Sequence, residues 1–249
     1  MRRPLIAGNW KMHLTIPAAR ALAAAVAKAA EDVVDRDVLI APPFTMLAAV
    51  REAAGGKVLL AGQNVCWEEQ GAFTGEIAPG MLKEVGCAMA IIGHSERRQL
   101  FGESNGLINQ RVQGALKFGL VPILCVGETL AEREAGATFG VLETQLREGL
   151  AGVTLANGDQ LVIAYEPVWA IGTGKTATAA QAQEVHAFVR QTIGSLFEKN
   201  IAGQIRILYG GSVNPANVDE LMRQADVDGA LVGGAALKAE SFERIIHFQ

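Results

Sequence analysis

A carboxylate stands where an apolar run meets a glycine-containing loop. Glu166 follows the apolar residues 161–164 and directly precedes Pro167, and Gly172 and Gly174 lie a few residues further on. A carboxylate at the mouth of an apolar strand costs free energy unless it is paired or used, and a loop of this composition can close as a unit. The segment favours a catalytic base beneath a lid. A salt-bridged glutamate on a connecting loop is the alternative.

Further polar side chains also follow apolar runs. His94 lies between such a run and a predicted helix start, where backbone N–H groups disfavour a protonated imidazole and leave a neutral hydrogen-bond donor. Asn9 and Lys11 follow the first run. Taken singly, the histidine could be a satisfied core residue and the lysine a solvated one. An ammonium in one pocket with a neutral histidine and a carboxylate indicates an anionic substrate.

Two glycine pairs follow the last two apolar runs. Gly210 and Gly211 precede Ser212, and Gly233 and Gly234 come directly after the final run. Backbone N–H groups at such positions, together with a short helix N-terminus, can hold a phosphate dianion. Tight turns alone explain one pair more readily than both. The pairs therefore predict a phosphate site.

Other chemistries lack part of their motif. Residues 172–176 end like a P-loop, but Trp169 occupies the position of the first required glycine. Residues 94–96 read His-x-Glu as in zinc deaminases, yet the Pro-Cys-x-x-Cys partner is absent. The four histidines, at positions 13, 94, 186 and 247, give no ligand cluster. The sequence therefore predicts neither a metal nor a redox cofactor.

Short apolar runs that would position these groups recur along the whole chain. They are residues 5–7, 38–41, 58–61, 88–92, 121–126, 161–164, 205–208 and 230–232. None alternates apolar with polar residues, which is typical of parallel strands covered by helices on the outer face. Helix signals fill the intervals between the runs: capping boxes at Thr129/Glu132 and Thr178/Gln181, a start at Asn214-Pro215, and stops at Gly55 and Gly119.

Eight strand–helix units within 249 residues match a (β/α)8 barrel that forms one domain, residues 1–249. A doubly wound sheet would place a glycine-rich dinucleotide fingerprint after the first strand, and residues 8–12 lack it. In a barrel, the loops after the strands share one face. The polar groups named above would therefore meet in one pocket.

Composition restricts the partners and the location. The chain carries 22 basic and 26 acidic residues without a long run of either sign, so nucleic acid is not expected as a partner. Three cysteines without CxxC spacing argue against a disulfide framework or a structural zinc site. Neither a signal peptide nor a membrane span is visible. We expect a soluble, cytoplasmic protein.

Together these groups fit proton transfer next to a carbonyl group. Glu166 would remove a carbon-bound proton, His94 would polarise the carbonyl, and Lys11 would stabilise the enediolate. A phosphate-binding barrel that serves only as a scaffold would be expected to lack one of these three. The alternative is another phosphosugar isomerase on the same fold, with a pocket that takes a longer sugar, because the sequence does not give the depth of the pocket.

The chain resembles the triosephosphate isomerase family over its whole length. The motifs that carry the resemblance are residues 8–12, 92–98, 164–175, 209–213 and 231–235. The resemblance implies a TIM barrel and cofactor-free interconversion of D-glyceraldehyde 3-phosphate and dihydroxyacetone phosphate through an enediolate, in glycolysis and gluconeogenesis.

The resemblance also assigns individual roles. It implies substrate contacts at Asn9, Lys11, Gly172, Ser212, Gly233 and Gly234. Tyr209 and Ala177 are similar to the pair that holds the family's lid closed. Residues 70–76 match a long loop that implies a homodimer, with Thr74 reaching toward the partner's active site. Ala236 departs from the family, which commonly has serine there, and this puts in doubt one hydroxyl's contribution to helix capping or phosphate contact.

Overall fold

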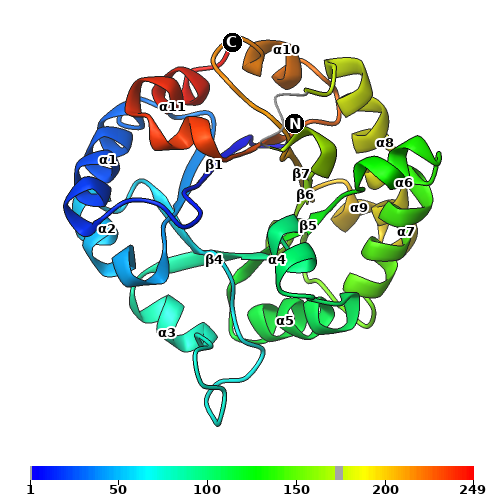
Figure 1. The fold of residues 1–249 in the computed structure, drawn as a ribbon, viewed down its shortest axis with the longest axis horizontal. Coiled ribbons are helices and arrows are strands. Elements are labelled where there is room, and N and C mark those ends of the chain that lie inside the picture. Colours follow the sequence, from blue (N-terminus) through cyan, green and yellow to red (C-terminus); the bar gives the residue numbers. More distant parts are fainter. Residues whose placement is uncertain (1, 172–175) are drawn as a thin grey trace.

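A closed, fully parallel barrel forms the centre of the molecule. The computed structural model describes residues 2–171 and 176–249. Each strand pairs with the next, and the last pairs with the first. The strands are β1 (Leu5–Asn9), β2 (Asp37–Ala41), β3 (Leu59–Gly62), β4 (Cys87–Ile92), β5 (Val121–Val126), β6 (Val162–Tyr165), β7 (Arg206–Tyr209) and β8 (Gly229–Val232). Figure 1 shows the helices in a ring outside this barrel, which confirms the predicted (β/α)8 architecture.

Helices connect successive strands, as predicted. The α-helices are α1 (Ile16–Ala29), α2 (Leu47–Ala54), α3 (Pro79–Glu84), α4 (Ser95–Leu100), α5 (Asn105–Lys117), α6 (Leu130–Glu134), α7 (Thr138–Gly149), α8 (Ala179–Leu196), α9 (Lys199–Ala202), α10 (Val218–Met222) and α11 (Ala239–Ile246). Short 3₁₀ turns are η1 (Phe44–Met46), η2 (Gly158–Gln160), η3 (Val168–Ala170) and η4 (Gly234–Leu237). In the part of the chain that is described, no helix combines the length and apolar character needed to cross a bilayer.

The predicted helix boundaries are mostly confirmed. Both capping boxes are present, at the starts of α6 and α8. Gly55 and Gly119 adopt left-handed backbone conformations after α2 and α5, which other residues enter at a cost.

One predicted helix start is wrong. The Asn214-Pro215 pair was expected to open a helix, but residues 215–217 form a turn and α10 begins at Val218. The Asn214 side chain accepts hydrogen bonds from the N–H groups of Ala216 and Asn217 at 2.9 and 3.2 Å. An asparagine that bonds the backbone two residues on stabilises a turn in competition with a helix.

The apolar runs are buried on both sides. Side chains such as Leu5 and Ala7 pack with Leu39 inside the barrel, whereas Ile6 packs outward against the helices. The side chains of Leu5, Ile6 and Ala7 are completely buried. Two-sided burial explains why the runs do not alternate with polar residues.

A buried histidine lies on the barrel-facing side of α8. The His186 side chain is completely buried, and its Nδ1 donates to the backbone oxygen of Asp226 at 3.1 Å. The ring lies edge-on to Tyr165, with centroids 5.9 Å apart. Burial lowers the pKa of His186 to about 4, although the Asp226 carbonyl opposes the shift. The ring is therefore neutral at neutral pH.

This histidine should make stability depend on pH. Because its pKa is lower in the folded than in the unfolded protein, the unfolded state binds the proton first and stability falls as pH drops below about 6.5. Between pH 7.5 and pH 5 we expect a loss of about 2 kcal/mol from this residue. Denaturant unfolding of wild type and His186→Gln over this pH range, at one protein concentration, isolates the contribution of His186 to the free energy of unfolding. A difference between the two proteins that does not change with pH would contradict this reading.

Candidate active site

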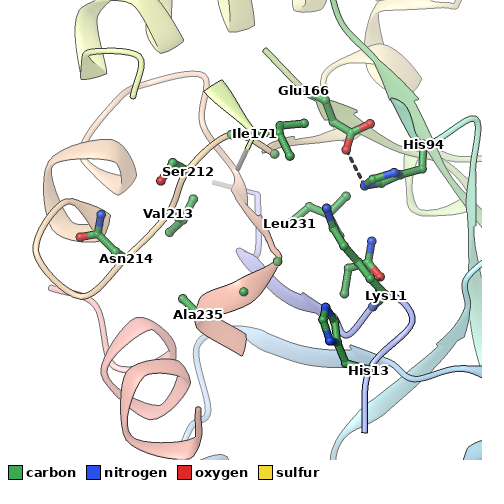
Figure 2. Close-up of a pocket in the computed structure, with 15 residues that line it drawn as sticks. Lys11, His13, His94, Glu166, Ile171, Ser212, Val213, Asn214, Leu231 and Ala235 are labelled. Carbon is green, nitrogen blue, oxygen red and sulfur yellow. Dashed lines mark hydrogen bonds and ion pairs between the residues drawn. The ribbon is translucent and has the colours of Figure 1, made fainter. Parts of the chain in front are cut away.

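The carboxyl ends of the strands surround a cavity of about 460 Å³. Seven of the predicted site residues line it, namely Asn9, Lys11, His94, Glu166, Ser212, Gly233 and Gly234. Figure 2 shows Glu166, His94 and Lys11 on one side and Ser212 and Asn214 on the other. The eighth, Gly172, lies outside the described residues. Among the residues that are described, no group of three or more potential side-chain ligands could hold a metal ion.

Glu166 lies directly after β6, and its carboxylate is held at both oxygens. Oε1 lies 2.8 Å from His94 Nε2, and Oε2 accepts from the backbone N–H of Ser95 at 2.9 Å. Only 2% of Glu166 is exposed. Burial raises the pKa of this carboxyl, but the His94 ring and the Ser95 amide outweigh burial and hold the pKa below its usual value. The group is an ionised carboxylate able to accept a proton.

His94 caps the N-terminus of α4, where the sequence placed it. Its Nδ1 accepts from the backbone N–H of Glu96 at 3.2 Å, so the ring hydrogen is assigned to Nε2, which donates to Glu166. Burial lowers the pKa of His94, but the Glu166 carboxylate outweighs it and raises the pKa. The helix start thus bonds Nδ1 as expected, while the adjacent carboxylate shifts the pKa in the opposite direction.

Lys11 is held in a strained backbone conformation. Its φ of 50° lies in the left-handed region, which costs a residue other than glycine roughly 1 kcal/mol. The Asn9 side chain accepts from its N–H at 3.0 Å, and Gln63 Nε2 donates to its carbonyl at 2.7 Å. The ammonium lies 2.6 Å from Glu96 Oε1 and reaches toward His94 in Figure 2. Neighbouring side chains thus fix the direction of this cation.

The two glycine pairs differ in their surroundings. A Cβ at Gly210 would lie 2.9 Å from Glu166 Cγ, and one at Gly211 would overlap the Tyr209 hydroxyl oxygen. This first pair is therefore required for close packing against the carboxylate segment. A Cβ at Gly234 would meet nothing within 4 Å, and η4 starts there. The open backbone at β8 is the better candidate for holding a phosphate.

The segment before residues 172–175 is hydrogen-bonded to the barrel, and the segment after them lies close to it. Trp169 Nε1 donates to Glu128 Oε1 at 2.9 Å, and Glu128 is completely buried. On the other side, burial raises the pKa of Tyr209 to about 12, while the nearby N–H of Ala177 opposes the shift. The predicted pair of Tyr209 and Ala177 is therefore close in space.

Several lining residues were given no role in the site by the sequence. They are His13, Ile171, Val213, Asn214, Leu231 and Ala235. Position after a strand could have indicated most of them, because the loops there share one face. Ala236, by contrast, is completely buried beside Gly8 and is absent from the cavity lining. The missing serine hydroxyl at that position is therefore not a cavity contact.

Comparisons with known proteins cover the whole chain. Residues 4–249 match the family described as triosephosphate isomerase. The chain is 56% identical over 250 residues to the triosephosphate isomerase of Syntrophotalea carbinolica, covering 100% of this chain and 99% of that protein. It is 55% identical over 252 residues to that of Geobacter metallireducens, with 100% of both covered. For the Roseiflexus protein of the same name, the identity is 54% over 249 residues, covering 100% of this chain and 98% of that protein.

Proposed function

The chain belongs to the triosephosphate isomerase family, and from this premise we propose that its cavity interconverts D-glyceraldehyde 3-phosphate and dihydroxyacetone phosphate. The observation that carries the proposal is the 2.8 Å contact between Glu166 and His94, with the Lys11 ammonium in the same cavity. Such an enzyme acts in glycolysis and gluconeogenesis, for which the cytoplasm is the proposed location. The closed barrel supports a single domain over residues 1–249.

The proposed reaction moves one proton between neighbouring carbons. Substrate would enter between Glu166 and His94, so that the carboxylate takes a proton from carbon and the His94 Nε2 hydrogen bonds the carbonyl oxygen. The Lys11 ammonium would offset the negative charge that develops on the enediolate oxygens. Returning the proton to the adjacent carbon, while His94 passes the hydroxyl hydrogen from one oxygen to the other, completes the isomerisation, and the protein ends in its starting state.

The phosphate group would lie on the opposite side of the cavity. Backbone N–H groups at Ser212, Gly233 and Gly234 and the start of η4 support this placement. We also propose Gly172 as a phosphate contact and Asn9 as a residue that contacts substrate while positioning Lys11. These contacts would hold the phosphate while proton transfer takes place about the carbonyl.

Turnover by the purified protein tests this function. In buffer containing a chelator and no cofactor, we expect rapid conversion of glyceraldehyde 3-phosphate and none of longer phosphorylated sugars. Turnover of a longer sugar alone would favour another phosphosugar isomerase. Folded protein that binds inorganic phosphate but converts neither substrate would indicate a phosphate-binding barrel that serves only as a scaffold.

We further propose that the protein is a homodimer built around Thr74. Figure 1 shows the chain between β3 and α3 extending away from the barrel. At this projection, Phe73 is 37% exposed and packs edge-on against Trp67, with ring centroids 5.4 Å apart. Phe101, in the loop after α4, is also largely exposed. Apolar side chains on loops of one barrel face would be covered by a second copy.

Sedimentation of a surface variant tests the dimer. Wild type should sediment at twice the 26.3 kDa chain mass, whereas Phe73→Asp should sediment as a monomer because a carboxylate would be buried without a partner. Phe139→Asp is the control, since Phe139 is similarly exposed, at 39%, but lies on α7. A monomeric wild type, or dissociation by both variants alike, would contradict the proposal.

A further inference from the structure

We propose that Gln145 on α7 is a positioning residue for the catalytic base, acting through the backbone of Gly127. Gln145 Oε1 accepts from the Gly127 N–H at 2.8 Å, and its Nε2 donates to the Gly127 carbonyl at 3.1 Å. One carboxamide thus pairs with both polar groups of a single residue. This role rests on the proposed function, because it assigns the alignment of Glu166.

Gly127 lies at the point where the strand ladder ends. The last paired residues of β5 and β6 are Val126 and Tyr165, and the N–H of Glu166 then donates to Val126 O at 2.8 Å. Beyond this bond, the N–H and C=O of Gly127 have no partner in the ladder, and Gly127 is partly buried, where unpaired backbone groups are costly. The Gln145 side chain supplies both, as a neighbouring strand residue would.

The backbone of Gly127 packs directly against the backbone of Glu166. A Cβ at position 127 would overlap the Glu166 carbonyl oxygen and lie 2.6 Å from its carbonyl carbon. Since no side chain intervenes, a shift of the Gly127 peptide must move the Glu166 main chain. The carboxylate oxygens are held at the other end by His94 and Ser95. Gln145 therefore fixes the position of the Glu166 main chain, from which the catalytic side chain extends.

Gln145 acts from outside the catalytic cavity. It does not line that cavity, and among the described residues it forms no hydrogen bond or ion pair with His94 or Lys11. Its own position is fixed because Leu142 and Leu146, on either side of it on α7, are completely buried. Its loss should therefore change the alignment of the base while the phosphate contacts stay in place.

The first test is Gln145→Met, which keeps the side-chain length and removes both hydrogen bonds. We expect kcat per folded protein to fall roughly 10- to 100-fold, with KM changed less than about twofold, because a small displacement of a reacting group is expensive. Gln183→Met is the matched control. Gln183 is also a half-buried helical glutamine that bonds one residue twice, Asp226, at 2.7 and 3.0 Å. It should lower stability comparably and leave kcat unchanged.

The second test, Gln145→Glu, replaces the donor with an ionisable oxygen. A protonated glutamic acid offers one acceptor and one O–H donor, so it can satisfy both groups of Gly127, whereas the carboxylate would face the Gly127 carbonyl. Relative to wild type, its kcat should therefore recover as pH is lowered from 8 toward 5.5. Merely structural damage would not reverse in this way.

The outcomes separate this inference from the proposed function. If wild type does not isomerise triose phosphates, the function itself fails. If wild type is active and folded Gln145→Met retains full kcat, only the role of Gln145 is overturned. Equal losses in Gln145→Met and Gln183→Met, or a loss in Gln145→Glu that is constant with pH, would also overturn it.

Discussion

Replacing Glu166 by aspartate is expected to lower kcat about 10³-fold, equivalent to roughly 4 kcal/mol of barrier, with KM changed less than about threefold. The substitution keeps the charge and withdraws the carboxylate by one methylene. The backbone cannot follow, because Gly127 abuts Glu166 and the N–H of Gly210 donates to the Tyr165 carbonyl at 2.7 Å. The carboxylate would then lie too far from the carbon that loses the proton, while the phosphate contacts remain.

Glu166→Gln should be slower still, because an amide cannot accept the proton. Its NH₂ group must also face a donor, either His94 Nε2–H or the Ser95 N–H, since both now donate to the carboxylate. Circular dichroism would establish that both variants fold. Wild-type kcat in folded Glu166→Asp would show that another group removes the proton.

Removal of the ammonium at Lys11 is expected to have an effect of similar size. Lys11→Met should lower kcat/KM about 10³-fold, because the nearly isosteric side chain keeps the packing and deletes the only part that attracts an anion. Unlike the Glu166 variants, this one should affect both KM and kcat, since the ammonium acts on the bound substrate and on the enediolate. Steady-state kinetics over a range of substrate concentration separates the two parameters.

A control variant separates the effect of the position of Lys11 from the effect of losing one positive charge. Lys28→Met removes the same charge from the exposed surface of α1 and should leave both parameters unchanged. Equal effects of the two lysine variants would mean that Lys11 contributes only to the overall field of the protein. Wild-type kinetics in Lys11→Met would remove it from the mechanism altogether.

The fold could be predicted from the sequence because burial leaves a local pattern. A strand covered on both faces must be apolar throughout, and helix caps such as Thr178 with Gln181 bond within four residues. The same locality explains the failure at Pro215, where a turn stabilised by Asn214 has the same composition as a helix start.

Most of the candidate site was also predictable, because strand ends share one face of a barrel. What could not be predicted depends on contacts between distant segments. The raised pKa of His94 arises from Glu166, which is 72 positions away in the chain. The clamp on Gly127 comes from Gln145, which in the sequence is only another polar residue on a helix.

The most direct test of the central claim is the origin of the hydrogen on carbon after isomerisation. Glyceraldehyde 3-phosphate should be converted by wild type in D₂O, and the dihydroxyacetone phosphate examined by mass spectrometry and NMR. A proton taken up by the Glu166 carboxylate can exchange with solvent, so we predict that a substantial share of the product carries carbon-bound deuterium at the position that receives the proton. Rapid conversion with no deuterium on carbon would indicate direct hydride transfer and contradict a carboxylate base.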